Sequence, residues 1–300
     1  MKRILTVFLL AFSFFSIPLY AQVEKSDTID IADTLRNEQN LKFHERFLYD
    51  MKRIGGGVIY VYSRPFKWQG NDWARFGGTV GTAALMAATI DEPVHEFFQD
   101  NQTQTLDETE TFLFPFGKPG PTYLFTAGLY SIGLVANNEW IRDTGVIITV
   151  TLTTAGLVQT AAKTAIGRAR PSTGVGAWEY KPFDNRPGYH SLPSGHIIMI
   201  LSSAYVLGRR IDYLPAKIAM YGLAGAVGLS RMYSSAHFPS DLFLGSILTI
   251  ACAEASIRYV EKGKEKQFSL RDDEPVRHEP PAIRWSLGPS FGGLSLTGRF

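Results

Sequence analysis

Five apolar segments of helical length dominate the chain between residues 122 and 260. They cover residues 122–135, 144–167, 196–209, 215–229 and 241–260. Short breaks that contain asparagine, aspartate or proline separate them. No segment before the C-terminal tail alternates apolar and polar residues with a period of two, so the segments predict helices rather than strands.

Two further helices are expected before these segments. Residues 73–89 are apolar and rich in glycine and alanine, which allow helices to approach closely. Asp91-Glu92-Pro93 is typical of a helix start, and that helix should end near Asn101. Residues 102–120 are polar at first and then rich in Phe, Gly and Pro, so we expect a loop there. The sequence therefore predicts an all-α fold, a bundle of about six core helices.

The first residues, 1–21, have the form of a secretory signal peptide. Two basic residues precede the apolar run 4–17, and the small residue Ala21 fits a cleavage site. Leu19 is bulkier than the residue usually found at its position, so an uncleaved anchor remains an alternative. Either way the protein is expected to be exported.

Three more regions follow the signal peptide. Residues 22–70 form a polar and amphipathic segment that Gly55-Gly56-Gly57 should interrupt. Residues 71–261 form the helical domain, and residues 262–300 form a charged linker and tail. In the tail a short β-hairpin-like appendage is predicted by the alternation of Ile283, Trp285 and Leu287, followed by Leu294 and Leu296.

Composition excludes some classes of partner. The net charge of +2 and the lack of a basic stripe argue against nucleic acid. The single cysteine, Cys252, excludes an internal disulfide and lies in an apolar run, which is typical of a buried small side chain. Residues 144–162 and 119–138 are free of charge and long enough to span a bilayer. These observations favour membrane association with a periplasmic-facing site, with a soluble exported protein as the alternative.

The stretch from Ser230 to Asp241 carries the first candidate for chemistry. His237 and Asp241 are four residues apart, a spacing that places two side chains on one face of a helix. The carboxylate could then hold the imidazole in one tautomer and make it a nucleophile. Arg231 adds a fixed positive charge, which indicates chemistry on an anion such as a phosphoryl group.

Two earlier motifs could complete an anion site. Lys163 and Arg170 lie seven residues apart and share a helical face, although cations in a last helical turn also simply offset the helix dipole. Ser194 and Gly195 stand directly before an apolar helix, where backbone amides can bind an anion. An ordinary helix cap is an equally good explanation of the serine. His196 at the same helix start could donate a proton to a bound anion.

Taken together, the three motifs resemble the signature of the type 2 phosphatidic acid phosphatase superfamily. The eleven matching positions are Lys163, Arg170, Pro171, Pro193, Ser194, Gly195, His196, Ser230, Arg231, His237 and Asp241. The resemblance covers roughly residues 73–260 and leaves out the N-terminal segment and the tail.

The resemblance implies a role for each residue of the site. His237 would attack phosphorus to form a phosphohistidine, and Asp241 would orient its ring. His196 would protonate the leaving alkoxide and later activate water. The equatorial phosphate oxygens would be bound by Lys163, Arg170, Arg231, Ser194 and the Gly195 amide. No metal or other cofactor is expected, because these cations balance a phosphate dianion.

The family resemblance leaves the substrate open. The leading expectation is a metal-independent phosphatase acting on a lipid-linked phosphate or pyrophosphate, such as a phosphatidate, an isoprenyl pyrophosphate or the phosphate of lipid A. The alternatives are a soluble periplasmic acid phosphatase, a vanadium-dependent haloperoxidase and a non-catalytic anion-binding membrane protein. For an enzyme, His237 should start neutral and His196 charged, which predicts a bell-shaped pH dependence of kcat/KM.

Overall fold

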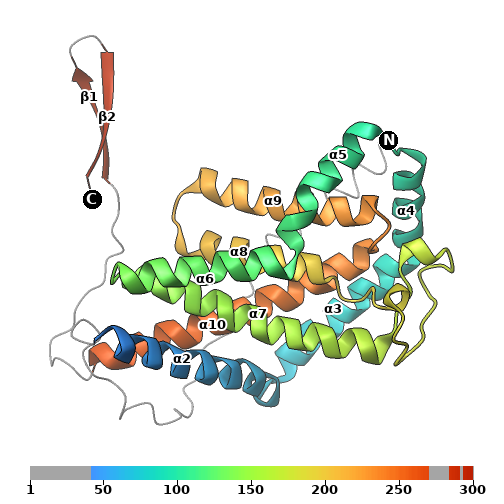
Figure 1. The fold of residues 1–300 in the computed structure, drawn as a ribbon, viewed down its shortest axis with the longest axis horizontal. Helices are drawn as coiled ribbons and strands as arrows, with labels where there is room; N and C mark the ends of the chain where they lie inside the picture. Colours follow the sequence, from blue (N-terminus) through green and yellow to red (C-terminus); the bar gives the residue numbers. More distant parts are fainter. Residues whose placement is uncertain (1–41, 270–283, 291–292, 300) are drawn as a thin grey trace. The chain divides into compact units, whose positions relative to one another are not determined.

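The computed structural model describes residues 42–269, 284–290 and 293–299 (Figure 1). The chain divides into two units, one ending at Glu261 and one starting at Lys262, and each is described by itself. The expected signal peptide, residues 1–21, and residues 22–41 of the segment that follows it lie outside the described residues.

The first unit is a bundle of α-helices, which confirms the predicted all-α fold. The helices of the described chain are α2 (Phe43–Ser63), α3 (Gly70–Thr89), α4 (Asp91–Asp100), α5 (Gln104–Leu113), α6 (Pro119–Val135), α7 (Glu139–Ile166), α8 (Gly195–Arg210), α9 (Leu214–Tyr233) and α10 (Pro239–Ser269). In the second unit, β1 (Arg284–Ser290) and β2 (Gly293–Arg299) pair as an antiparallel hairpin with Leu287 opposite Leu296.

Helix α7 lies in the middle of the bundle and contacts α2, α6 and α8 (Figure 1). The Asn138 side chain caps its start by accepting a hydrogen bond from the Ile141 amide at 3.0 Å. Gly167 ends it in the left-handed conformation at φ 63°, which glycine adopts without steric cost. Its buried aliphatic side chains form one core cluster with side chains of α8 and α10. Cys252 of α10 belongs to this cluster as a buried free cysteine, as predicted.

The three consecutive glycines do not interrupt helix α2, contrary to expectation. A Cβ at Gly56 would meet the Tyr259 hydroxyl of α10 at 2.2 Å, and one at Gly57 would meet Val150 of α7 at 2.9 Å. The glycines therefore allow α2 to pack closely on two helices, and that packing offsets their low helix propensity. Helix α2 ends at Ser63, just before Pro65.

Residues 102–120 are not the loop that we expected. They contain α5 and a short 3₁₀ helix, η5 (Phe114–Gly117). The Thr103 hydroxyl caps α5 by accepting a hydrogen bond from the Leu106 amide, and the Tyr233 hydroxyl of α9 donates to Asp107 at 2.6 Å. The helix is thus held by tertiary contacts, which overrule a composition typical of loops.

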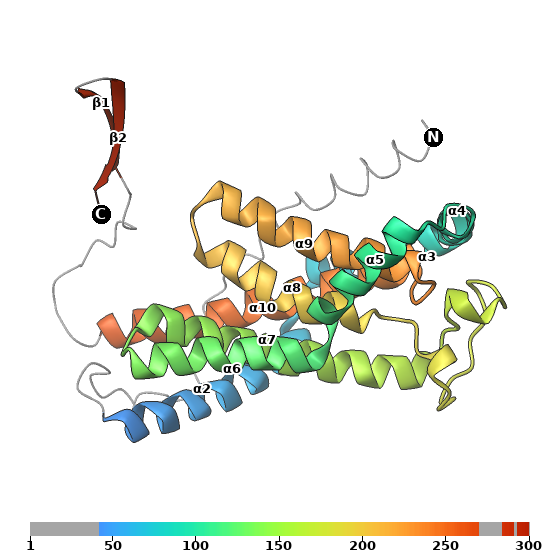
Figure 2. The same ribbon diagram turned by 45° about the horizontal axis from the view of Figure 1, so that its top comes forward.

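One end of the bundle gathers segments that are distant in sequence. Both views place α4, α5, the long connection from α7 to α8, the end of α9 and the start of α10 at this end (Figure 2). Helix α4 contacts α9, and η5 contacts α8 and α9. The signature residues lie in the α7–α8 connection, in the short segment between α9 and α10, and at the adjoining ends of α7, α8, α9 and α10.

Two helices of the described chain are long and apolar enough to cross a membrane. They are Glu139–Ile166 of α7 and Pro239–Gly263 of α10, with mean hydropathies of 1.5 and 1.4 over their most apolar windows. Half of each window is buried inside the protein, as in core helices of soluble proteins. Helix α6, the other span suggested by the sequence, has only 17 residues but leaves Leu124 and Val135 largely exposed.

Candidate active site

All the predicted site residues stand at or near helix ends. The last turns of α7 and α9 carry Lys163 and Arg231, and Arg170 follows in the connection after α7. Helix α8 opens with its N-cap residue Ser194, then Gly195 and His196; His237 lies just before α10, and Asp241 lies in the first turn of α10.

These residues are brought together around His196. Burial, reinforced by the positive charges of Arg231, Lys163 and Arg170, lowers the pKa of His196 to about 3. The neighbouring His237 also lowers the pKa of His196. Four helices and a connecting segment therefore direct their charged side chains at one place, as the sequence motifs implied.

Several buried polar atoms in this place have no hydrogen-bond partner among the described residues. They are Arg170 Nε, Ser194 Oγ, His196 Nε2 and His237 Nδ1. The hydroxyl of Ser194 does not cap α8, although its residue occupies the N-cap position. Buried polar atoms without partners are costly, so the cluster indicates a site for a ligand that supplies oxygen acceptors.

His237 and Asp241 do not share a helix face, because α10 begins at Pro239, after the histidine. They meet at the helix start instead, with 3.8 Å between His237 Nδ1 and Asp241 Oδ2. This distance is too long for a hydrogen bond, but it places the carboxylate beside the Nδ1 edge of the ring, where it favours a positive charge on the imidazole. The arrangement leaves Nε2 of His237 as the nitrogen that can attack.

The protonation states of the two histidines differ in part from expectation. Burial lowers the pKa of His237 to about 4, against the opposing effect of Asp241, so the ring is neutral at physiological pH as a nucleophile requires. His196, expected to be charged, is also neutral, because it is buried among cations. A phosphate dianion bound beside it would reverse that field and raise its pKa.

Residues 114–118 pack over the catalytic histidine candidate His196. The Phe114 ring stacks on the imidazole with centroids 5.2 Å apart, and the Arg231 guanidinium lies 4.5 Å from the Phe114 centroid on α5's side of the site. A Cβ at Gly117 would meet the His196 ring at 2.7 Å, so only glycine permits this approach. The segment that we expected to be a loop therefore forms a wall of the site.

A carboxylate already occupies part of the anion site. Glu110 of α5 forms an ion pair with Nη2 of Arg231. We predict that Glu110→Gln lowers the inhibition constant for inorganic phosphate and the KM of the substrate roughly fivefold, because removing a competing pair worth about 1 kcal/mol favours the incoming anion. Inhibition assays test this, with Glu108→Gln on the same helix as the control. An unchanged or weaker phosphate inhibition in Glu110→Gln would contradict the prediction.

Sequence reasoning missed the buried charges that support the site. Arg168 of the α7–α8 connection pairs with Asp241 at 2.6 Å and with Asp91 of α4 at 2.7 Å. Its position between Lys163 and Arg170 was the one available signal in the sequence. His190, in the same connection, has its Nε2 within 2.8 Å of the Asp184 carbonyl oxygen.

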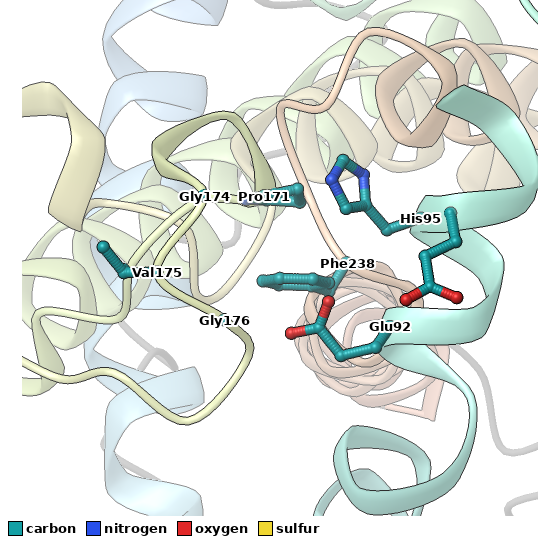
Figure 3. A pocket seen from close by; sticks show the side chains of 8 residues that line it. Glu92, His95, Pro171, Gly174, Val175, Gly176 and Phe238 are labelled. Atoms are coloured by element: carbon teal, nitrogen blue, oxygen red, sulfur yellow. The ribbon is translucent and has the colours of Figure 1, made fainter. Parts of the chain in front are cut away.

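A cavity of about 410 Å³ lies beside the site (Figure 3). It separates α4, with Glu92 and His95, from the turn that contains Gly174 and Val175. Phe238, the residue after His237, lines it and lies edge-on to the His95 ring. Among the described residues, no group of three or more His, Cys, Asp or Glu side chains is arranged to hold a metal ion.

Comparison with known proteins agrees with the site. Residues 144–265 match the family model of the PAP2 superfamily, a range that contains every signature residue. Over this range, which is less than half of the chain, the protein is similar to the PAP2 superfamily.

Similar proteins give a more particular comparison. The chain is 28% identical to a lipid A 1-phosphatase of Rhizobium etli over 196 residues, which cover 60% of this chain and 80% of that protein. It is 30% identical to a lipid A 1-phosphatase of Rhizobium johnstonii over 139 residues, covering 46% and 54%. The crystal structure of Aquifex aeolicus LpxE aligns with a TM-score of 0.46 and 21% identity, over 57% of this chain and 96% of that one.

Proposed function

We propose that this protein is a metal-independent phosphatase that hydrolyses a lipid-linked phosphate through a phosphohistidine intermediate. The observation that carries the proposal is the group of buried polar atoms without partners at the meeting point of Lys163, Arg170 and Arg231. Three cations beside buried polar atoms without hydrogen-bond partners suit a phosphate dianion.

The reaction has two steps. In the first, Nε2 of His237 bonds to phosphorus while the bond from phosphorus to the leaving oxygen breaks, and His196 gives that oxygen a proton. In the second, His196 takes a proton from water, whose oxygen attacks phosphorus and breaks the bond to His237. Phosphate leaves, and both histidines return to their starting states.

The anion-binding residues stabilise the phosphoryl group in both steps. Lys163, Arg170 and Arg231 supply positive charge, and Ser194 can donate its free hydroxyl. The Gly195 amide stands at the start of α8, where amides lack partners within the helix and the dipole favours an anion. Each donor aimed at the transition state contributes about 3 kcal/mol, or on the order of a hundredfold in rate.

A lipid substrate is supported by two independent observations. The similar proteins are named lipid A 1-phosphatases, so the 1-phosphate of a lipid A-like glycolipid is the leading candidate. Helices α7 and α10 have the length and hydropathy of membrane spans. We propose that the protein is exported and associated with the membrane, with its site facing the periplasm.

A substrate panel tests this function. Residues 22–300 should release phosphate from detergent-solubilised lipid A 1-phosphate much faster than from soluble phosphomonoesters, with phosphatidate and isoprenyl pyrophosphate as further lipid substrates. The reverse preference would indicate a soluble acid phosphatase. Halide oxidation after addition of vanadate would indicate a haloperoxidase. Binding of phosphate without turnover of any substrate would indicate a non-catalytic protein.

The same phosphate-release assays, repeated with a chelator, test whether the enzyme works without a metal. Rates should stay within about twofold after treatment with EDTA, because the residues themselves supply the charge that a metal would bring. A large loss that added divalent cation restores would contradict this part of the proposal.

A further inference from the structure

A buried charge network underlies the nucleophile without touching the anion site. Its centre is the Arg168 guanidinium, which bridges two carboxylates, Asp91 on α4 and Asp241 on α10. Asp91 and Asp241 are completely buried, and Arg168 is 1% exposed. Burial of three charged groups is costly, so the network needs its many hydrogen bonds to be stable.

Both oxygens of Asp241 are fixed by these bonds. Oδ1 accepts from Arg168 Nη1 at 2.6 Å, and Oδ2 accepts from the Ser191 hydroxyl at 2.5 Å and the Phe238 amide at 2.8 Å. Oδ2 is also the oxygen that faces His237 Nδ1. The orientation of the carboxylate toward the nucleophile therefore depends on the groups that hold it.

Asp91 holds the other side of the same network. Its Oδ2 accepts from Arg168 Nη2 at 2.7 Å and from the Ser240 hydroxyl, which in turn accepts from Arg168 Nη1 at 2.7 Å. Its Oδ1 accepts from the Ser240 amide at 3.0 Å. One carboxylate thus anchors both the guanidinium and the first turn of α10, the turn that carries Asp241.

Arg168 has little freedom to move once these bonds are made. Its Nε donates to the Ala177 carbonyl at 3.0 Å, and its guanidinium lies 4.7 Å from the Phe238 ring centroid. Phe238 also lines the cavity that separates α4 from the Gly174 turn (Figure 3). The network is therefore built where α4, the α7–α8 connection and α10 meet, directly behind His237.

We propose that Asp91 is a positioning residue for the nucleophile, acting on His237 through Arg168, Ser240 and Asp241. Two carboxylates and one guanidinium carry a net charge of −1, which favours the positive charge that the His237 ring gains as the phosphohistidine forms. Without the Asp91 charge, Arg168 neutralises Asp241 alone and the net charge falls to zero. Asp91 precedes residue 144, where the family match begins.

The test compares the effect of each substitution on kcat with its effect on the inhibition constant for inorganic phosphate. The proposal rests on the proposed phosphatase reaction. Asp91→Asn should lower kcat by tenfold to a hundredfold, while the inhibition constant for inorganic phosphate stays within twofold because the anion-binding residues are untouched. Asp91→Glu should recover part of kcat by restoring the charge. Arg168→Lys keeps the charge but cannot bridge both carboxylates, so it should also lose kcat.

A matched control separates positioning from folding. Asp143 is completely buried and pairs with Arg53 at 2.7 Å between α7 and α2, away from the site. Asp143→Asn should lower the thermal unfolding midpoint at least as much as Asp91→Asn and keep kcat within twofold. The proposal is overturned if folded Asp91→Asn keeps full kcat, if Asp143→Asn loses as much, or if phosphate binding weakens in parallel.

The Arg168→Lys variant keeps the proposal testable if Asp91→Asn does not fold. If Asp91→Asn cannot be purified folded, full kcat in folded Arg168→Lys overturns the proposal, and a loss of kcat with unchanged phosphate inhibition supports it. A native protein without phosphatase activity would instead reject the proposed function itself, which keeps the two failures distinct.

Discussion

We expect the His237→Ala variant to release phosphate from its lipid substrate about 10⁴-fold more slowly than the native protein, because it lacks the group that forms the covalent intermediate. His196 cannot replace it, since its ring is stacked on Phe114 rather than placed beside Asp241. Phosphate release measured at saturating substrate tests the expectation. The matched control is His44→Ala, which removes an exposed histidine of α2 and should leave the rate unchanged.

Two further measurements connect the loss to the proposed intermediate. Rapid quenching of the native protein with labelled substrate should trap an acid-labile, alkali-stable phosphoenzyme, and His237→Ala should give none. The His237→Ala variant should still bind phosphate, since Lys163, Arg170 and Arg231 remain. Substantial turnover in His237→Ala, or a phosphoenzyme that persists in it, would exclude His237 as the nucleophile.

Local patterns in the sequence were enough to predict most of the fold. Helices α7, α8 and α9 begin and end within five residues of the apolar segments, and Asn138 and Pro215 mark the starts of α7 and α9. Helix α10 begins at Pro239, close to its predicted start, but continues past residue 260 to Ser269. Helix α5 could not be predicted in the same way. Its composition is typical of a loop, and its stability depends on contacts such as the bond from Tyr233 to Asp107.

The residues of the site likewise fall into two groups, those that the sequence could predict and those that it could not. The residues that we propose to bind the anion follow a fixed spacing within each motif, so the sequence could predict them as a group. Asp91 and Arg168 support the site through bonds between helices, and no spacing in the chain indicates which carboxylate a buried arginine will meet. The ion pair of Glu110 could not be predicted for the same reason, since its partner Arg231 lies on another helix.

The structure also changes the interpretation of Asp241. From spacing alone it was a residue that shares a helix face with His237. In the structure it lies in the first turn of α10 and accepts the Phe238 amide, so the bond that holds the helix start also fixes the carboxylate. Helix capping and positioning of the nucleophile are one arrangement here, not competing explanations.

Replacing His196 with asparagine should separate the role of the proton donor from that of the nucleophile. With an alkoxide leaving group, we expect kcat/KM to fall by about 10²- to 10⁴-fold, the usual contribution of a general acid. With nitrophenyl phosphate the fall should be much smaller, because nitrophenolate leaves without a proton. Equal losses with both substrates would contradict the assignment of His196 as the acid.

The pH dependence of kcat/KM shows whether activity rises or falls as each group loses its proton. His237 has a pKa of about 4, so activity should rise as pH increases through that value and the nucleophile becomes neutral. His196 has a pKa of about 3, so its proton must arrive with the substrate or from solvent when the anion binds. Activity toward the lipid phosphate should therefore fall again as pH rises and the substrate loses its second proton, near pH 6.

With nitrophenyl phosphate this fall at high pH should be absent in both the native protein and the His196→Asn variant, since nitrophenolate leaves without a proton. Comparison must use kcat/KM, which reports the steps up to formation of the phosphoenzyme. The second step, hydrolysis of the phosphohistidine, is the same for every substrate and also needs His196. If that step limits kcat, both substrates lose kcat equally, and only kcat/KM retains the difference that identifies the acid.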